Sequence, residues 1–296
     1  MVSKVFIVSN FTIDRIKGLG SEGVGIGGPP YYCALALIHL GVESVVIVGS
    51  ASDIHEYFSR RVGAEVVRVS DSVPTFELKY LNGSGEREVR LVRCGGEVVL
   101  TNELISSMRG SLAIVNPVFK EVRSYVVKAI RSSVKTLAID VQGFVRVANG
   151  YGSISYEWGS EVREVLESAD LIHTDLSEAP LNGGMASVAR RLAKYVNGVL
   201  MVSNGEAGLV ALINGRLYYV PALPGIRGES TGTGDILLAI SSLAIHEGND
   251  PLRAVVMGAV AAGLKVSRVT PPWFSRYEVE VLTDKLLRGV KYLGST

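Results

Sequence analysis

The sequence predicts an α/β protein in which helices cover both faces of a mainly parallel sheet, with a small β lid beside it. Three observations lead to this prediction. Apolar runs of strand length alternate with segments of helical periodicity along most of the chain, which is typical of a parallel sheet. The strand Val5–Val8 has no polar position, as expected for a strand that is buried on both faces. One segment, 75–93, instead alternates polar and apolar residues, which indicates a hairpin with one solvated face.

The elements follow one another along the whole chain. Strands are expected at 5–8, 45–48, 65–69, 112–115, 137–141, 171–174, 199–202, 209–213 and 216–220. Helices are expected at 31–39, 54–61, 121–131, 162–167, 186–195, 235–246, 252–266 and about 277–292. Pro29 and Pro30 favour the start of the first helix, a glycine-rich loop is expected at 20–28, and Asn214-Gly215 is a two-residue hairpin signal.

The lid is expected from two segments, about 10–19 and about 73–94. Within the second segment, Asn82-Gly83-Ser84-Gly85 separates two alternating runs and would form the turn of a hairpin. No linker or internal repeat interrupts the chain, so residues 1–296 are interpreted as a single domain that carries this lid.

Composition excludes several classes of function. Apolar residues make up 47% of the chain, the net charge is +1 and the pI is about 7.7, so nothing favours binding to nucleic acid or to an anionic membrane. Cys33 and Cys94 provide neither a disulfide framework nor a metal-ligand spacing. The first residues are typical of a buried strand rather than a signal peptide, and we expect a cytoplasmic protein.

The most informative stretch is 229–240, where a glycine-rich turn runs directly into a helix. Gly232 and Gly234 allow backbone amides to approach a ligand, and the first amides of a helix favour an anion such as phosphate. A carboxylate at such a place, Asp235, would accept the proton of an attacking hydroxyl in phosphoryl transfer. The alternative is a structural Asp that the helix dipole favours in the first turn.

Other nucleotide motifs are weak or absent. Gly23-x-Gly25-x-Gly27-Gly28 lies too far after the first strand for a dinucleotide-binding loop, and no P-loop sequence occurs. Asp14 follows the first strand, at the carboxyl edge where ligands of α/β proteins bind. Its carboxylate could accept hydrogen bonds from sugar hydroxyls, or it could cap the backbone of its own loop.

Three later strands also end in polar residues. Asp140-Val141-Gln142-Gly143-Phe144-Val145-Arg146 follows one strand, His173-Thr174-Asp175-Leu176-Ser177-Glu178 ends the next, and Ser203-Asn204-Gly205-Glu206-Ala207-Gly208 ends a third. Arg146 could hold an anionic group or be a solvated loop residue, and His173 is interpreted as a packed strand residue.

Taken together, these motifs resemble the ribokinase, or PfkB, family of carbohydrate kinases. The family signature Asp-Thr-x-Gly-Ala-Gly-Asp corresponds to residues 229–235, with Glu229, Ser230 and Thr233 as departures. Further details, including Gly27-Gly28-x-x-Tyr31-Tyr32 and Asp140-x-Gln142-Gly143-Phe144, resemble the archaeal myo-inositol kinase branch. Matches occur in order from Asp14 to Asp235, so the resemblance covers nearly the whole chain.

The resemblance implies a role for each matched position. The catalytic group is Asp235 as base, with the anion site at Gly232, Thr233 and Gly234. Substrate binding is implied for Asp14, Gly27, Gly28, Gln142 and Arg146. Nucleotide binding is implied for Ser203, Gly205, Gly208, Thr231 and Ala262, and a contact through water with Mg²⁺ for Glu178.

The sequence therefore predicts a ribokinase-like kinase that uses ATP and Mg²⁺ to phosphorylate a hydroxyl of a small sugar or polyol, most simply myo-inositol. The alternatives are a nucleoside or other sugar kinase of the same family, and a sugar- or nucleotide-binding relative without catalysis. The expected partners are the small polyol or sugar substrate and a second copy of the chain that pairs through the lid, with no nucleic acid and no membrane.

Overall fold

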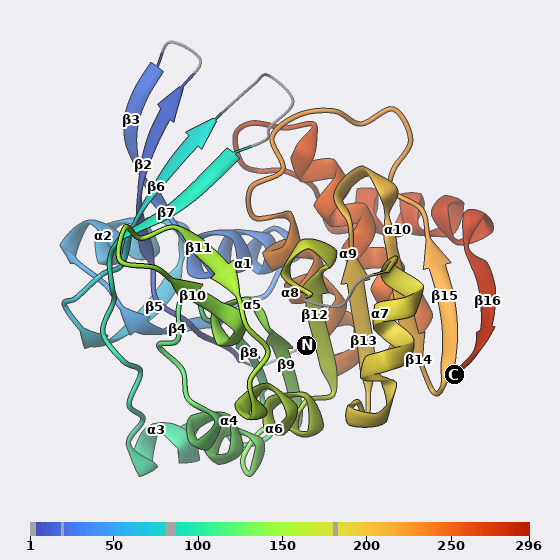
Figure 1. Ribbon diagram of the computed structural model, residues 1–296, viewed down its shortest axis with the longest axis horizontal. Coiled ribbons are helices and arrows are strands. Elements are labelled where there is room, and N and C mark those ends of the chain that lie inside the picture. The colour runs from blue at the N-terminus through green and yellow to red at the C-terminus, as the bar shows by residue number, and fades with distance from the viewer. Residues whose placement is uncertain (1–3, 19–20, 81–86, 180–182) are drawn as a thin grey trace.

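The computed structural model describes residues 4–18, 21–80, 87–179 and 183–296. They form a central sheet between two layers of helices, and a small second sheet projects from one edge of this body (Figure 1). This arrangement confirms the predicted α/β class and the predicted small sheet. No helix in these four ranges combines the length and the apolar character that a membrane span requires.

The central sheet contains ten strands among the described residues. In spatial order they are β16 (Lys291–Ser295), β15 (Arg216–Val220), β14 (Leu209–Ile213), β13 (Val199–Ser203), β12 (Leu171–Asp175), β9 (Thr136–Asp140), β8 (Leu112–Val115), β1 (Val5–Val8), β4 (Val45–Ser50) and β5 (Ala64–Ser70). Pairing is parallel from β5 to β13 and antiparallel from β13 to β16. The carboxyl ends of the parallel strands therefore meet at one edge of the sheet.

Each face of the sheet has its own hydrophobic core. Val5 and Ile7 belong to one core, whereas Phe6 and Val8 belong to the other, because side chains alternate along a strand. The first core contains residues of α1 (Pro29–His39), α2 (Asp53–Val62), α8 (Thr233–His246), α9 (Pro251–Val266) and α10 (Arg276–Leu286). The second core contains residues of α3 (Asn102–Ser107), α4 (Ser124–Arg131), α6 (Ser160–Ser168) and α7 (Met185–Leu192).

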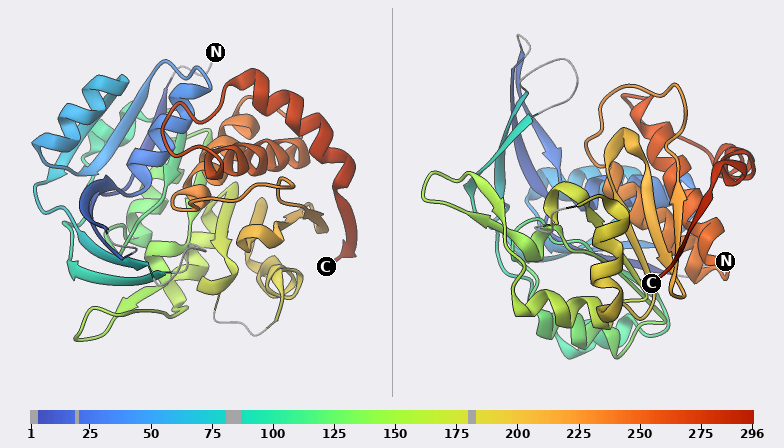
Figure 2. Two further views of the ribbon diagram at one scale, coloured as in Figure 1. Left: turned by 90° about the horizontal axis from the view of Figure 1, so that it is seen from above. Right: turned by 45° about the vertical axis from the view of Figure 1, so that its right-hand side comes forward.

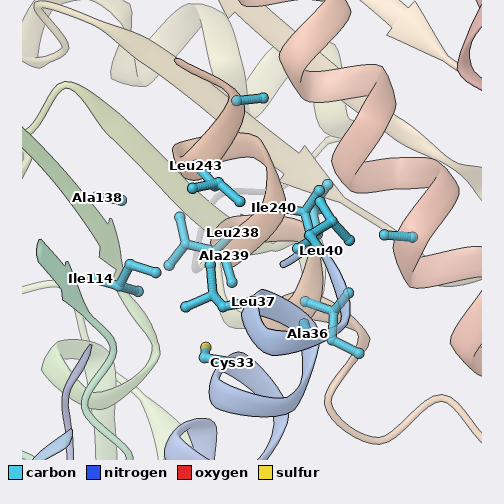
Figure 3. Packing of buried hydrophobic residues seen from close by; sticks show 14 of the residues in the cluster. Cys33, Ala36, Leu37, Leu40, Ile114, Ala138, Leu238, Ala239, Ile240 and Leu243 are labelled. Carbon is cyan, nitrogen blue, oxygen red and sulfur yellow. The ribbon is translucent and has the colours of Figure 1, made fainter. Parts of the chain in front are cut away.

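The helices α1 and α8 pack against each other in the first core. Cys33 and Leu37 of α1 lie beside Leu238 of α8, with Ile114 and Ala138 of the sheet next to them (Figure 3). The residues of α8 from Ile236 to Ala244 are buried, so this helix is held firmly over the sheet. Because α8 starts at the carboxyl edge of the sheet, its packing fixes where its first turn lies.

The small sheet, which we call the lid sheet, has the order β3 (Ser21–Gly27), β2 (Thr12–Gly18), β6 (Thr75–Tyr80) and β7 (Arg87–Arg93). It rises from the carboxyl edge of the central sheet (Figure 2). Pairing of β2 with β6 is parallel, and the two outer pairs are antiparallel. A two-stranded hairpin, β10 (Arg146–Ala148) with β11 (Ile154–Tyr156), lies beside it, and Leu91 N donates to Gly152 O at 2.8 Å. The expected turn residues 82–85 lie outside the described residues.

Several elements differ from the sequence-based expectation. The segment 21–27, expected as a glycine-rich loop, is strand β3, because it pairs with β2 over its whole length. The last predicted helix ends at Leu286, and β16 follows it as the edge strand beside β15. The helices α3 and α5 (Gln142–Val145) and the strands β10 and β11 were not predicted, since short elements carry little periodic signal.

Candidate active site

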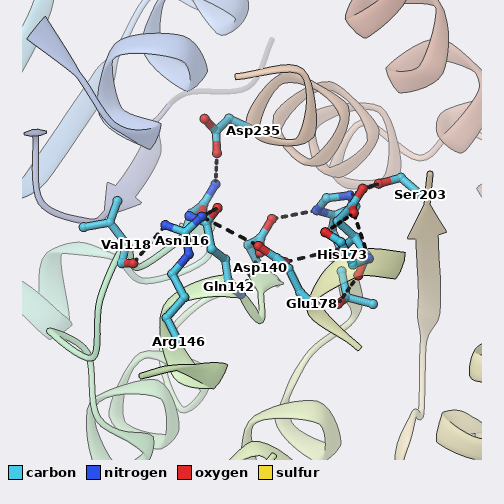
Figure 4. Close-up of polar contacts among 12 residues, drawn as sticks. Asn116, Val118, Asp140, Gln142, Arg146, His173, Glu178, Ser203 and Asp235 are labelled. Atoms are coloured by element: carbon cyan, nitrogen blue, oxygen red, sulfur yellow. Dashed lines mark hydrogen bonds and ion pairs between the residues drawn. The ribbon is translucent and has the colours of Figure 1, made fainter. Parts of the chain in front are cut away.

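Polar side chains gather at the carboxyl edge of the central sheet, below the lid sheet. Asn116 follows β8, Asp140 ends β9, Asp175 ends β12 and Ser203 ends β13. Parallel strands bring these ends together, although the residues are far apart in sequence. Figure 4 shows two neighbouring groups of contacts, one between Asn116 and Asp235 at the start of α8, and one that reaches from Asp140 through His173 to Ser203.

Asp235 lies in the first turn of α8 and faces the end of β8. Asn116 Nδ2 donates to Asp235 Oδ1 at 2.8 Å (Figure 4), which fixes the orientation of the carboxylate. Burial and the nearby charge of Asp140 raise the pKa of Asp235 to about 6, while the hydrogen bond from Asn116 acts in the opposite direction. Asp235 is therefore ionised at neutral pH but is a stronger base than an exposed aspartate.

The turn before α8 requires glycine at position 232. Gly232 has φ 78° and ψ 5° at the N-cap position, and a Cβ there would meet the ring of Tyr32 at 2.2 Å. Glycine is thus required both by the backbone conformation and by the ring beneath it. The N-terminus of α8 supplies backbone N–H groups and partial positive charge at the position of Asp235.

Thr233 differs from the role implied by the resemblance. Its amide donates to Ser230 O at 3.2 Å, and its hydroxyl donates to the same oxygen at 2.8 Å. Thr233 thus closes the turn instead of directing its donors at a ligand. The first amides of α8, at Gly234 and Asp235, are the better candidates for an anion site.

A second cluster joins Gln142, Arg146 and Glu178. Arg146 Nη2 donates to Gln142 Oε1 at 2.6 Å and lies 3.7 Å from Glu178 Oε1, while Nη1 donates to Val118 O at 3.2 Å. Glu178 is 6% exposed, and burial together with the charge of Asp140 raises its pKa to about 7. The structure therefore brings these predicted residues together, but Gln142 and Arg146 bind each other rather than being directed separately at a substrate.

His173 is more than a packed strand residue. Its Nδ1 lies 2.6 Å from Asp140 Oδ2, its Nε2 lies 3.0 Å from Ser203 Oγ, and Ser203 Oγ donates to Asp175 Oδ2 at 3.1 Å (Figure 4). Burial alone would lower the pKa of His173, but the Asp140 carboxylate outweighs it, and the net pKa lies above the usual value. A continuous polar chain thus connects the ends of β9, β12 and β13.

Asp14 and the glycine pair lie on the lid side of the site. Asp14 is on β2 and accepts a hydrogen bond from Thr12 Oγ1 at 2.7 Å. Gly27 ends β3, and a Cβ there would come within 2.0 Å of Asp14 Oδ2, so only glycine leaves room for this carboxylate. Gly28 is the N-cap of α1, so the pair links the lid sheet to the first helix.

Tyr32 connects this side to the turn before α8. Burial raises the pKa of its hydroxyl, and the charges of Glu229, Asp14 and Asp235 raise it further. The Tyr32 hydroxyl therefore lies close enough to be affected by the charges of Asp14, the predicted substrate-binding residue, and of Asp235, the predicted base.

The residues implied for nucleotide binding belong to the end of β13, the turn after it, the turn before α8 and the helix α9. Ser203 is held by His173 and Asp175, while Gly205 and Gly208 form the tight turn between β13 and β14. Ala262 is a half-buried residue of α9, and Thr231 accepts or donates a hydrogen bond of 3.4 Å with Tyr80 of the lid sheet. These positions are neighbours of the site, but their predicted role stays a prediction.

Sequence reasoning missed three site residues. Asn116, Tyr32 and Asp140 contact or polarise the predicted catalytic groups. Asp140 was singled out only as part of a motif, and Tyr32 only as part of the resemblance. The single available signal for Asn116 was its position directly after a buried strand, which is shared by many structural residues.

These features define a class of protein. A carboxylate base with a raised pKa, set in the first turn of a helix at the carboxyl edge of an α/β sheet and faced by a lid, is the arrangement of an enzyme that transfers a phosphoryl group to a hydroxyl.

Comparison with known proteins identifies the family. A fructokinase from Klebsiella pneumoniae is 33% identical over 281 residues, which cover 86% of this chain and 89% of that protein. No protein-family model matches the chain. The chain belongs to the ribokinase, or PfkB, family of carbohydrate kinases, and is a phosphotransferase with a sugar or polyol hydroxyl as acceptor.

Solved structures have the same fold. A pyrophosphate-dependent kinase in the ribokinase family, complexed with a pyrophosphate analog and myo-inositol, aligns with a TM-score of 0.78 at 21% identity over 94% of this chain and 99% of that chain. The ribokinase of Arabidopsis thaliana, complexed with ribose and ATP, aligns with a TM-score of 0.70 at 17% identity over 96% of this chain and 99% of that chain.

Proposed function

We propose that this sugar kinase transfers the γ-phosphoryl group of ATP to a hydroxyl of a small neutral polyol, most simply myo-inositol. The observation that carries the proposal is the carboxylate of Asp235, which Asn116 orients at the N-terminus of α8 and whose pKa lies at about 6. In this position it can accept a proton at neutral pH while the adjacent amides stabilise negative charge on the phosphoryl group.

The mechanism assigns one step to each group. The acceptor hydroxyl would bind beside Asp235, which takes its proton as the oxygen attacks the γ-phosphorus, while the bond from this phosphorus to the β,γ-bridging oxygen breaks and ADP leaves. The amides at Gly234 and Asp235 hold the transferring group at the start of α8. The lid sheet covers the acceptor side and excludes water, which would otherwise accept the phosphoryl group.

The charge around Glu178 fits a cation that is bound through water. Among the described residues, no group of His, Cys, Asp or Glu has the geometry of a direct metal site. However, burial and the carboxylates of Asp140 and Asp175 raise the pKa of Glu178 more than Arg146 and His173 lower it, so negative charge gathers at this point. A hydrated Mg²⁺ shared with the donor phosphates would offset this charge, and Mg²⁺ commonly keeps several waters.

A neutral acceptor is favoured by the state of Arg146. Its guanidinium is already bound to Gln142 Oε1, Val118 O and the Glu178 carboxylate, so it does not stand ready for an anionic substrate. Asp14 instead offers a carboxylate to substrate hydroxyls from the lid side. The similarity to a kinase complexed with myo-inositol supports a cyclic polyol, which presents hydroxyls around its whole ring.

Pyrophosphate is a second candidate donor. ATP is supported by the Ser203–Gly208 turn beside the antiparallel pair β14 and β15, and by the family relative complexed with ATP. Pyrophosphate is supported by three structures with a TM-score of at least 0.75, each described as pyrophosphate-dependent. Both donors would present the same terminal phosphoryl group to α8.

The test is a matrix of donors and acceptors. Product formation is followed by phosphorus NMR with ATP or pyrophosphate against myo-inositol, fructose, ribose and a nucleoside. Rapid phosphorylation of myo-inositol alone supports the proposal, and preference for another acceptor contradicts it. The Asp235→Asn variant is the control for contaminating kinases.

We further propose that two copies pair through the lid sheet. β3 is its free edge in the described chain, and Val24 on that strand is 73% exposed. Analytical ultracentrifugation of the wild type and of Val24→Glu tests this proposal. A monomeric wild type contradicts it, whereas a dimer that Val24→Glu dissociates supports it.

A further inference from the structure

Lys265 is a buried lysine that the mechanism above does not use. It lies near the end of α9, and its side chain is only 4% exposed. Its Nζ donates to Glu229 Oε2 at 2.6 Å and to Glu229 O at 3.0 Å. Both acceptors belong to the turn that leads into α8, so the ammonium group is bound to that turn by a side-chain and a backbone oxygen.

The Glu229 carboxylate also binds the backbone of the turn before the proposed anion site. Glu229 Oε1 accepts a hydrogen bond from Thr231 N at 2.6 Å, which fixes the backbone one residue before Gly232. Burial raises the pKa of Glu229, but the hydrogen bonds from Lys265 and Thr231 outweigh it, and the net pKa lies below its usual value. The carboxylate is therefore ionised and joins Lys265 to the turn.

Tyr32 provides a second connection. Lys265 Nζ lies 5.6 Å from the centroid of the Tyr32 ring, within the range of a cation–π contact. The same ring packs against Gly232, where it leaves no room for a Cβ. The Lys265 ammonium group, the Tyr32 ring and the Glu229 carboxylate together hold the turn in place.

An ammonium group that is taken out of water needs compensating partners, and here they come from the turn and from the ring beneath it. We propose that Lys265 is an internal cation that shapes the Glu229–Gly232 backbone for anion binding and makes the enzyme independent of soluble monovalent cations. Lys265 is a positioning residue, because it acts through Glu229 and Tyr32. This inference rests on the proposed binding of the phosphoryl group at the start of α8.

The first test uses the unmodified protein. Phosphorylation rates are measured at equal ionic strength in the chlorides of potassium, sodium, ammonium and tetramethylammonium, with the donor supplied as its Tris salt. The proposal expects the same rate in every salt, because the cation is part of the chain. A wild type that is active only with potassium or ammonium would overturn it, and this outcome does not depend on the folding of any variant.

The second test removes the ammonium group. Lys265→Ala should lower kcat by about 10- to 100-fold in tetramethylammonium chloride, the scale of a misplaced catalytic element. Ammonium or methylammonium should restore much of the lost rate, because alanine leaves room for a small cation beside Glu229. Lys265→Met should lose the same activity without restoration, because its side chain fills that space. Lys285→Ala, at an exposed position of α10, is the matched control.

A structural role alone would not produce this pattern. Circular dichroism establishes that each variant is folded, and a folded Lys265→Ala variant that keeps the wild-type kcat contradicts the proposal. An equal loss of kcat for Lys265→Ala in ammonium chloride and in tetramethylammonium chloride also contradicts the proposal.

Pyrophosphate binding separates this inference from the proposed function. Measured by calorimetry, binding needs no acceptor, so Lys265→Ala should bind weakly in tetramethylammonium chloride and more tightly in ammonium chloride. If that pattern holds while no polyol is phosphorylated, the proposed function alone is rejected. If polyols are phosphorylated but Lys265→Ala shows no response to cations, this inference alone is rejected.

Discussion

At the residue scale, Asp235 is the proposed base of this kinase. Its carboxylate combines partial burial, a hydrogen bond from Asn116 and a place in the first turn of α8. Burial and Asp140 raise its pKa, while Asn116 and the cations His173 and Arg146 lower it. The balance of these terms leaves a base suited to neutral pH.

Replacing Asp235 by Asn should remove the base without changing its size. We expect kcat to fall by about 10²- to 10⁴-fold, the usual contribution of a general base, while donor binding persists. Steady-state rates and calorimetric donor affinity check this expectation. A variant that keeps more than about a tenth of the wild-type kcat would exclude the assigned role.

The pH dependence of kcat/KM should report the same group. Only the ionised carboxylate accepts a proton, so kcat/KM should be highest above pH 6 and fall as pH decreases through the Asp235 pKa of about 6. In Asn116→Ala the hydrogen bond that lowers this pKa is lost, and the acidic limb should shift to higher pH. Identical pH profiles for the wild type and Asn116→Ala would contradict the assignment of this pKa to Asp235.

Asp14→Ala should act on acceptor binding. Each hydrogen bond lost from a substrate hydroxyl to a charged acceptor costs about 1.5–3 kcal/mol, so KM for the polyol should rise strongly. KM for the phosphate donor should change little, because Asp14 lies on the lid side of the site. Equal increases in the two KM values would remove Asp14 from the acceptor site.

At the element scale, the lid sheet is the unit that we propose to close the site. It contacts the turn before α8 through Tyr80, whose hydroxyl lies 3.4 Å from Thr231 Oγ1. Its apolar side packs in a small cluster of Phe76, Leu78, Leu91 and Val118, which connects the lid strands to the loop after β8. The lid sheet is therefore in direct contact with the turn that leads into α8.

Tyr80→Phe should weaken closure without disturbing the fold, because it removes one hydroxyl. We expect hydrolysis of the donor to rise relative to polyol phosphorylation, since water is excluded less effectively. Parallel measurement of both rates gives this ratio. Tyr125→Phe, at an exposed tyrosine of α4, is the control, and an unchanged ratio in Tyr80→Phe would contradict a role of this contact in closure.

At the scale of the whole molecule, the helices α8 and α9 hold the site together. Asp235 lies in the first turn of α8 and Lys265 near the end of α9, so the contact between the helices sets the position of the Asp235 carboxylate relative to the Lys265 ammonium group. The approach is close at Gly258, where a Cβ would meet Ser241 Oγ at 2.1 Å and Leu237 O at 2.6 Å.

Gly258→Ala should therefore separate the two helices. Overpacking of this kind typically costs about 1–3 kcal/mol, more than alanine gains in helix propensity. We expect a lower melting temperature by calorimetry, together with a lower kcat. Gly150→Ala, where a Cβ meets nothing within 4 Å, is the control, and equal stability of the two variants would contradict tight packing at Gly258.

The sequence by itself determined the layered α/β architecture, the lid hairpin and the turn that leads into Asp235. These features depend on neighbouring residues: apolar runs define buried strands, alternation defines a half-solvated hairpin, and glycines before a helix define its N-terminus. The helix α8 starts within two residues of its predicted start for this reason.

Only the tertiary structure decided the partners of those elements. β3 is glycine-rich and becomes a strand because β2 provides its hydrogen bonds, and β16 forms only beside β15. Asn116 and Asp235 are 119 residues apart, and Lys265 meets Glu229 only because α9 packs on α8. Hydrogen bonds and ion pairs act over a few ångströms in space, so the chain order does not contain them until the sheet and its helices have folded.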